Sequence, residues 1–227
     1  MHDLPCLCIN LDERKDKWEA TELEFQGTGI FPQRFSAIKH TQGWRGCGAS
    51  HVAIAREAML RGLPWVLVVE DDCKLVADFS ERWPTVKKSL WEERGKWDIF
   101  LGGPTYIQGP AQNLGEHLIE IDRGFALHFY VLHATAYEKA IAWNPDRHGP
   151  IDVYYSDQFR VVSTNPILAT QRASKSDIKG FSTDYVDFFN ESNSTLEQLS
   201  YSLRTRSGTI GLILLSGLIL ITIWSKR

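Results

Sequence analysis

The chain has 227 residues, 43% hydrophobic and 23% charged, which is enough for one well-buried domain with appendages and not for two domains. Its formal net charge of -3 offers no basic surface for a phosphate backbone, which excludes nucleic acid as a main partner. Four cysteines without a CxxC pair are too sparse for a secreted disulfide scaffold. They favour a reducing compartment, with zinc as a minor alternative.

The first half of the chain alternates apolar runs with helical patterns, which predicts an α/β sandwich with a mostly parallel central sheet. Ser50 is expected to cap a helix through Leu60, which Gly62 ends in a left-handed conformation. The elements expected before that helix are a strand over 7–11, a charged helix over 14–24 and a short strand near 34–37.

An unbroken apolar run over 65–69 ends abruptly in Glu70, Asp71 and Asp72. The run predicts a central strand covered on both faces, whose carboxyl end delivers charge to the edge where open α/β sheets bind ligands. Three adjacent carboxylates repel one another unless a positive ion lies between them, and oxygen ligands suit Mg²⁺ or Mn²⁺ better than zinc. The alternative is a solvated acidic turn before the next helix.

The elements expected after the acidic triplet continue the alternation of strands and helices. They are a helix over 78–93 begun or interrupted at Pro84, a strand over 97–101, a hairpin over 118–132 broken at Gly124, a helix over 134–143 and a short helix over 152–161.

The end of the chain differs from the rest in composition. Residues 208–224 contain no charge and would span about 25 Å as a helix, slightly less than a typical hydrocarbon core. Because the start lacks a secretory signal, we expect a single-pass, tail-anchored membrane protein with a cytosolic catalytic domain. The alternative is a buried core helix. The expected division is a catalytic domain over 1–180, a polar linker over 181–207, the transmembrane anchor over 208–224 and a basic tail over 225–227.

Five separate motifs occur in an order and spacing that resemble glycosyltransferase family 25, which includes lipooligosaccharide and collagen galactosyltransferases. The resemblance covers roughly residues 6–178. The motifs are Ile9–Asp12 followed by Arg14, Gly46–His51, Glu70–Asp72, Asp98–Gly102, and Gln171 with Ser176–Ile178.

The resemblance implies a GT-A-like nucleotide-sugar-binding fold, a UDP-hexose donor, Mn²⁺ or Mg²⁺, and inversion at the anomeric carbon. A cation held by carboxylates at the donor phosphates would stabilise the departing diphosphate as a Lewis acid. The expected activity is metal-dependent transfer of galactose or glucose to a glycan, lipid-linked or protein acceptor. The short domain and the expected anchor disfavour collagen as the acceptor.

By the resemblance, Asp72 is the expected direct metal ligand. Glu70 would contact the ribose or share the metal, and the role of Asp71 is undecided. Other donor contacts are expected from residues that could equally be ordinary helix caps or turn residues. Asn10 and Asp12 would contact the base and the ribose, and Arg14 or Lys15 would contact a phosphate. Ser50 and His51 would begin a helix whose start faces an anion.

Inverting transfer also needs a base for the acceptor hydroxyl. Asp152 and Asp157 are the candidates, and Asp157 is preferred because Asp152 follows Pro150 and is well placed simply to start a helix. A further metal ligand is expected from His128 or His133, unless these are ordinary core or surface histidines.

Two other classes of function fit the sequence. One is a catalytically degenerate, tail-anchored glycosyltransferase-like binding or scaffold protein. The other is a different metal-dependent nucleotide enzyme, such as a nucleotidyltransferase or phosphohydrolase. The chain contains no P-loop that would indicate a kinase.

Overall fold

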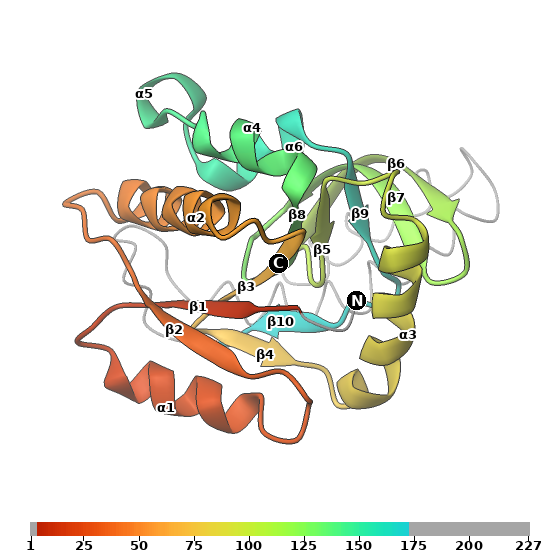
Figure 1. Cartoon of the computed structure of the whole chain (residues 1–227), viewed down its shortest axis with the longest axis horizontal. Coiled ribbons are helices and arrows are strands. Elements are labelled where there is room, and N and C mark those ends of the chain that lie inside the picture. The colour runs from red at the N-terminus through yellow and green to blue at the C-terminus, as the bar shows by residue number, and fades with distance from the viewer. Residues whose placement is uncertain (1–3, 173–227) are drawn as a thin grey trace, which may run out of the picture.

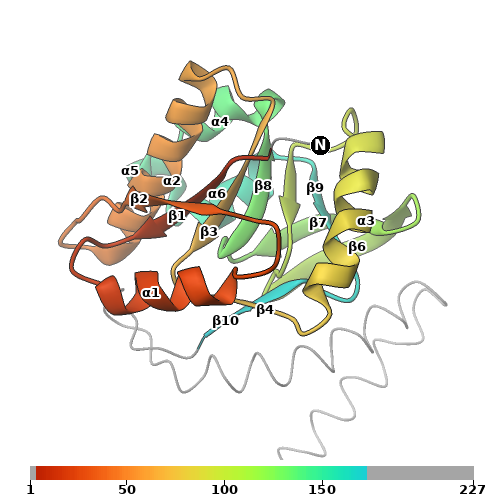
Figure 2. The ribbon, with the colours of Figure 1, turned by 60° about the horizontal axis from the view of Figure 1, so that its bottom comes forward.

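The computed structural model describes residues 4–172, in which an eight-stranded sheet lies between layers of helices (Figures 1 and 2). The strand order is β2-β1-β3-β8-β5-β9-β7-β6, and β4 and β10 form a separate ladder. The strands are β1 (Cys6–Asn10), β2 (Pro32–Ser36), β3 (Trp65–Glu70), β4 (Cys73–Leu75), β5 (Ile99–Leu101), β6 (Tyr106–Leu114), β7 (Leu118–Phe125), β8 (Phe129–His133), β9 (Val161–Ser163) and β10 (Ala169–Gln171).

Six of the eight strands of the large sheet run in one direction, which confirms the expected α/β fold with a mostly parallel sheet. Strands β2 and β3 are parallel to β1. Strand β8 is antiparallel to both β3 and β5, so β5 runs with β3. Strand β9 is parallel to β5, and β7 is antiparallel to both β9 and β6. The two reversed strands are therefore β8 and β7.

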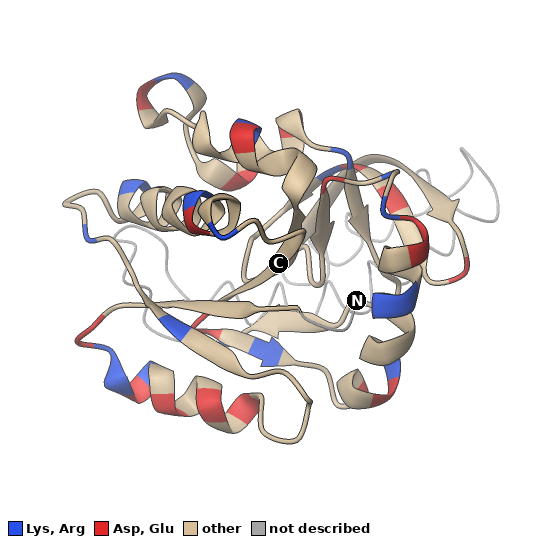
Figure 3. Ribbon diagram, in the orientation of Figure 1, with Lys and Arg blue, Asp and Glu red and all other residues tan. Residues whose placement is uncertain are grey.

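The helices form two layers, one on each face of the sheet (Figure 1). Helices α2 (Gly43–Leu60), α4 (Tyr137–Ile141), α5 (Pro145–His148) and α6 (Ile151–Gln158) lie on one side, with the short 3-10 turn η1 (Ala134–Ala136) leading into α4. Helices α1 (Lys15–Glu24) and α3 (Phe79–Glu92) lie on the other. Charged side chains lie mainly on helices and loops (Figure 3).

The period of two along β3 explains why its sequence is an unbroken apolar run. Val66 and Val68 join the core cluster that includes Ile54 of α2. Leu67 and Val69 join the opposite cluster, which includes Trp83 of α3. Because successive side chains point to opposite faces and both faces are covered, every position of the strand is apolar.

Helix α2 begins at Gly43, so the expected N-cap at Ser50 is wrong. The glycines at 46 and 48, a pattern that is typical of a turn, lie inside the helix. A Cβ at Gly46 would lie 2.4 Å from the Ile38 carbonyl oxygen, and one at Gly48 would lie 2.4 Å from the Trp143 ring. Both glycines thus permit close packing rather than a turn. The helix end at Gly62, with φ +63°, is confirmed.

The expected hairpin over 118–132 is also wrong. Strand β7 pairs with β6, and β8 leaves it to insert between β3 and β5. The register of the β6 ladder shifts between Gln108 and Ala111, around Gly109 and Pro110, and these two residues mask β6 in the sequence. Helix α3 runs continuously through Pro84 instead of beginning or breaking there.

The predicted linker over 181–207 and anchor over 208–224 lie outside the described residues. Among residues 4–172, no helix has the length and apolar character needed to cross a membrane.

Candidate active site

A cleft of about 370 Å³ opens at the carboxyl ends of β1 and β3, where the sequence places the acidic triplet. Its walls come from the β1–α1 connection, the loop between β2 and α2, and the start of α2. The lining residues are Ile9, Leu11, Glu13, Lys17, Ala37, Ile38, Lys39, His40, Gly43, Cys47, Ser50, Glu70, Asp71 and Asp72. The cleft is large enough for a small-molecule ligand.

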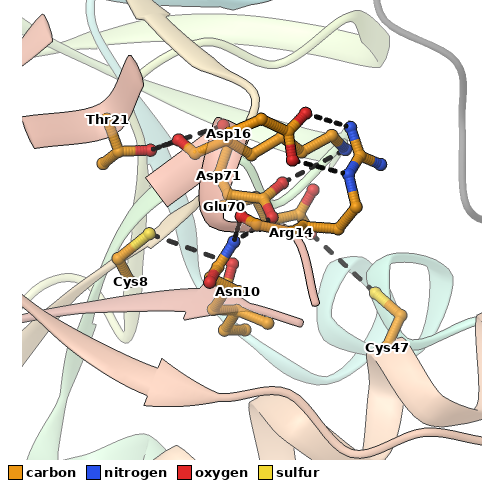
Figure 4. A network of polar contacts seen from close by, with 10 residues as sticks. Cys8, Asn10, Arg14, Asp16, Thr21, Cys47, Glu70 and Asp71 are labelled. Atoms are coloured by element: carbon orange, nitrogen blue, oxygen red, sulfur yellow. Dashed lines mark hydrogen bonds and ion pairs between the residues drawn. The ribbon is translucent and has the colours of Figure 1, made fainter. Parts of the chain in front are cut away.

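Glu70 faces the α2 layer, as Val68 and Val66 do two and four residues earlier. Its Oε1 lies 3.2 Å from His51 Nε2. The same oxygen lies 3.9 Å from Cys47 Sγ (Figure 4). Burial acts to raise the pKa of Glu70, but the hydrogen bond with His51 and the neighbouring basic side chains together outweigh it, so the pKa lies below the ordinary value. Glu70 is thus held as a carboxylate.

Asp71 faces the opposite layer and contacts α1 (Figure 4). Its Oδ2 accepts a hydrogen bond of 2.8 Å from the Asn10 amide, and its Oδ1 lies 3.3 Å from Lys17 Nζ. The Thr21 hydroxyl, one turn along α1 from Lys17, donates to the Asp71 carbonyl at 3.4 Å. Burial raises the pKa of Asp71 despite these partners. The contacts make Asp71 a residue that ties the acidic turn to α1.

Asp72 is the member of the triplet whose carboxylate is left unsatisfied. Its Oδ1 is buried and has no hydrogen-bond partner within residues 4–172. Burial, followed by the negative charge of Glu70, raises the pKa of Asp72 to about 7. A buried, unpartnered carboxylate oxygen beside a second carboxylate fits a divalent cation, and an oxygen-donor set favours Mg²⁺ or Mn²⁺.

The backbone of the acidic turn is fixed from two later segments. The Glu70 N–H donates to the His128 carbonyl at 3.0 Å, and the Arg172 N–H donates to the Asp72 carbonyl at 2.6 Å. The short ladder of β4 with β10 continues directly from this second bond. The turn is therefore a rigid part of the fold and not a solvated loop.

The three residues expected to contact the donor at the end of β1 do not line the cleft, and their side chains have other partners. Asn10 is buried and holds the turn: its amide donates to the Arg14 carbonyl at 2.9 Å and accepts from Arg34 Nε at 2.8 Å. Asp12 is exposed, with Arg34 and Ser36 as partners, which keep its pKa low. The Arg14 guanidinium pairs with Asp16 at 3.0 Å.

Ser50 and His51 lie in the middle of α2, so the expected anion site at a helix start is wrong at these residues. Ser50 accepts from the Ile38 N–H at 2.8 Å and fixes the loop that forms the cleft wall. His51 is fully buried behind Glu70, with Nδ1 2.9 Å from the Tyr130 hydroxyl. The start of α2 that lines the cleft is Gly43.

The two candidate bases differ in position. Asp157 forms an ion pair with Arg123 of β7. Asp152, at the first turn of α6, lies close enough to Cys47 for its charge to help raise the pKa of that thiol, after burial and Glu70. Asp152, and not the preferred Asp157, is thus the candidate whose charge acts on a residue of the cleft.

The two candidate histidines lie at opposite ends of β8. His133 pairs in register with Trp65, at the far end of β3 from the acidic turn, so it is not a ligand there. His128 adjoins Glu70 through its backbone and is fully buried. Neither of its ring nitrogens has a hydrogen-bond partner in the described part of the chain.

Four cleft residues that carry a basic group or a thiol were not assigned a role from the sequence. Lys17, Lys39 and His40 bring basic groups into the cleft, and Cys47 brings a thiol. Lysines in a charged helix and a loop carry no distinguishing pattern. Cys47 does have a recognisable spacing in the sequence. It precedes His51 by four residues, so the two side chains share one face of a helix.

Sequence comparisons confirm the resemblance to glycosyltransferase family 25. A Bos taurus protein named "Probable inactive glycosyltransferase 25 family member 3" is 28% identical over 129 residues, covering 55% of this chain and 22% of the relative. The Homo sapiens protein named "Inactive glycosyltransferase 25 family member 3" is 25% identical over 153 residues, covering 63% of this chain and 26% of the relative. The chain therefore spans about a quarter of the length of these curated relatives. No family model matches the chain.

Solved structures with a similar arrangement are distant. A glycosyltransferase involved in glycosylation of the major capsid of PBCV-1 is 14% identical with a TM-score of 0.43, over 65% of this chain and 68% of that one. UDP-glucose pyrophosphorylase complexed with UDP-glucose is 12% identical with a TM-score of 0.46, and the match covers 86% of this chain and 81% of that one. At these TM-scores neither likeness bears on activity.

Proposed function

We propose that the chain is a metal-dependent inverting glycosyltransferase domain that binds a UDP-hexose, with galactose or glucose as the sugar, in the cleft at the end of β3. The observation that carries the proposal is Asp72 Oδ1, a buried carboxylate oxygen without a hydrogen-bond partner among residues 4–172. The resemblance to family 25 supports a sugar-transfer reaction at this site.

In this proposal Asp72 and Glu70 hold the cation. Mn²⁺ or Mg²⁺, when bound, acts as a Lewis acid on the donor diphosphate. Lys17, Lys39 and the start of α2 at Gly43 surround the same cleft and would bind the phosphate oxygens.

The acceptor side of the proposal rests on Asp152. As a carboxylate near Cys47 it would accept the proton of the acceptor hydroxyl while that oxygen attacks the anomeric carbon and the diphosphate leaves. One displacement of this kind inverts the anomeric centre. The acceptor is a glycan, a lipid-linked sugar or a protein.

The test is calorimetric binding of UDP-galactose and UDP-glucose with Mn²⁺, followed by measurement of sugar transfer or donor hydrolysis. Asp72→Asn should weaken metal-dependent donor binding at least a hundredfold, equivalent to about 2.7 kcal/mol. Glu92→Gln, the same change of carboxylate to amide on an exposed part of α3, should leave binding unchanged. Normal turnover by Asp72→Asn would reject the assignment.

A second candidate is a domain that binds the nucleotide sugar without transferring it. The names of the two relatives, both containing the word inactive, favour it. The same experiment separates the candidates, because donor binding that depends on Asp72 with no turnover from any donor would select the binding domain. A failure to bind any UDP-hexose with Mn²⁺ would contradict both.

We also propose that residues 208–224 anchor the protein in a membrane with the domain in the cytosol, on the strength of their uncharged sequence. Protease treatment of intact membrane vesicles should digest the domain. Protection of the domain from the protease would contradict the cytosolic orientation.

A further inference from the structure

Three side chains of different chemistry converge where α2 meets the end of β3. Cys47 and His51 are four residues apart on α2 and therefore share one face of the helix, and Glu70 approaches that face from β3. One potential ligand atom from each of the three lies within 4.8 Å of the others. A sulfur, a nitrogen and an oxygen donor thus meet at one point.

The two distances from Glu70 lie within a few tenths of an ångström of the edges of a metal tetrahedron. His51 Nε2 is 3.2 Å and Cys47 Sγ is 3.9 Å from the same oxygen, Oε1 of Glu70. Zinc bonds of about 2.0 Å to oxygen and nitrogen and about 2.3 Å to sulfur place tetrahedral ligands roughly 3.3 to 3.7 Å apart. Small side-chain adjustments would be enough to surround an ion.

The surroundings of His51 are those of a histidine ligand. Its Nδ1 lies 2.9 Å from the Tyr130 hydroxyl, and both side chains are fully buried. A hydrogen bond at one ring nitrogen fixes the ring and directs the other nitrogen, as is usual for metal-binding histidines. Here it directs Nε2 at Glu70.

Access to the cluster comes from the cleft, because Cys47 and Glu70 both line it while His51 lies behind them. An ion can enter from the cleft side, and a fourth coordination position faces the same way. Three protein ligands with one open position are the arrangement of zinc sites that also bind water or a small ligand.

We propose that Cys47, His51 and Glu70 form a binding site for a thiophilic divalent cation of the zinc class. Sulfur and imidazole donors select such an ion over Mg²⁺ or Mn²⁺, so this site is chemically distinct from the oxygen-donor site at Asp72. Binding releases the thiol proton of Cys47 to solvent as the sulfur bonds the metal. As Nε2 of His51 bonds the metal, the proton that it shared with Glu70 leaves to solvent or is replaced by one on Nδ1, which can donate to the Tyr130 hydroxyl. The inference does not depend on the proposed sugar transfer, although Glu70 is common to both sites.

Cobalt(II) is the probe, because a thiolate bound to cobalt produces an intense near-ultraviolet absorption band. Titration of the purified full chain with Co²⁺ should give this band at one ion per chain, and Zn²⁺ should displace it. Cys47→Ser should abolish the band. Cys6→Ser, the same change at a buried cysteine outside the cluster, should retain it.

Two variants keep the test decisive if changes to the ligands disturb folding. Tyr130→Phe leaves all three ligands in place but removes the partner of His51, and should weaken cobalt binding about ten- to a hundredfold. Asp72→Asn should retain the thiolate band. Absence of the band from folded wild-type protein, or its persistence in Cys47→Ser, would overturn the inference whether or not the protein binds UDP-hexoses.

Discussion

At the scale of single residues, three adjacent acids have three different environments. Glu70 and Asp71 point to opposite faces because the period of a strand is two, so one meets His51 of α2 and the other meets Lys17 of α1. Asp72, in the turn, keeps an unpartnered oxygen within the described residues. The triplet itself was visible in the sequence, but its partners lie on other elements and could not be assigned from spacing alone.

The two candidate bases provide a matched pair of substitutions. Asp152→Asn should lower the rate of sugar transfer at least a hundredfold while donor affinity stays within about twofold, because the base acts on the acceptor and not on the donor. Asp157→Asn breaks only the surface ion pair with Arg123 and should change transfer little. Steady-state kinetics with the best donor measures both, and the opposite ranking would restore Asp157 as the base.

At the scale of elements, the regions that could be predicted are those where local pattern and tertiary packing agree. The apolar run of β3 and the end of α2 at Gly62 are of this kind. The start of α2 could not be predicted, because its glycines are explained by tertiary contacts with the Ile38 carbonyl and the Trp143 ring, which the local pattern does not reveal. Strand β6 was hidden by Gly109 and Pro110, which elsewhere indicate a turn.

Gly46→Ala tests the contact between α2 and the cleft wall. The added Cβ would lie 2.4 Å from the Ile38 carbonyl oxygen and 3.0 Å from the His40 N–H nitrogen, and backbone atoms cannot simply rotate away. The loop should move, weakening donor binding and lowering the free energy of unfolding by about 1–3 kcal/mol. Calorimetry and denaturant titration measure the two effects. Gly95→Ala, with open space around its Cβ, should change neither.

Asp98, part of one of the motifs that resemble family 25, has a structural role and joins β5, η1 and β9. Its carboxylate accepts from Arg160 Nε and the Arg160 N–H at 3.0 Å and from the Thr135 hydroxyl at 2.8 Å. Burial acts to raise the pKa of Asp98, but the Arg160 hydrogen bonds outweigh it and lower the pKa to about 2. A carboxylate with a lowered pKa stabilises the fold above its unfolded pKa.

The stability that Asp98 contributes should therefore be present above pH 3.8 and be lost as the pH falls toward 2. Because Arg160 is half exposed, the contribution is about 1–2 kcal/mol after allowance for solvent screening. Denaturant titrations of wild type and Asp98→Asn across this range should converge at the acid end. A difference that stays constant with pH would contradict this assignment.

At the scale of the whole molecule, Glu24 joins three segments that are far apart in sequence. It lies at the end of α1, its Oε1 accepts from the Leu75 N–H of β4 at 2.8 Å, and its Oε2 pairs with Arg172 at 2.5 Å. Arg172 also holds the acidic turn through its own N–H. Glu24 thus connects the outer helix, the small ladder and the site.

Replacing Glu24 with alanine should lower the free energy of unfolding by about 2 kcal/mol, because it leaves the Leu75 N–H without its acceptor and the Arg172 guanidinium without its carboxylate partner. It should also weaken donor binding by loosening the turn at Asp72. Glu22→Ala, an exposed position on the same helix, is the control for helix propensity. Equal stability of the two variants would show that the connection is not needed.

The two backbone hydrogen bonds that hold the acidic turn also determine when the site is completed during synthesis. Their partners, His128 and Arg172, are made long after Glu70 and Asp72 have left the ribosome. A nascent chain that ends before residue 128 contains the whole acidic motif but lacks both of its backbone supports. The cation site that we propose at Asp72 would therefore be completed late in synthesis, once β8 and β10 have joined their ladders.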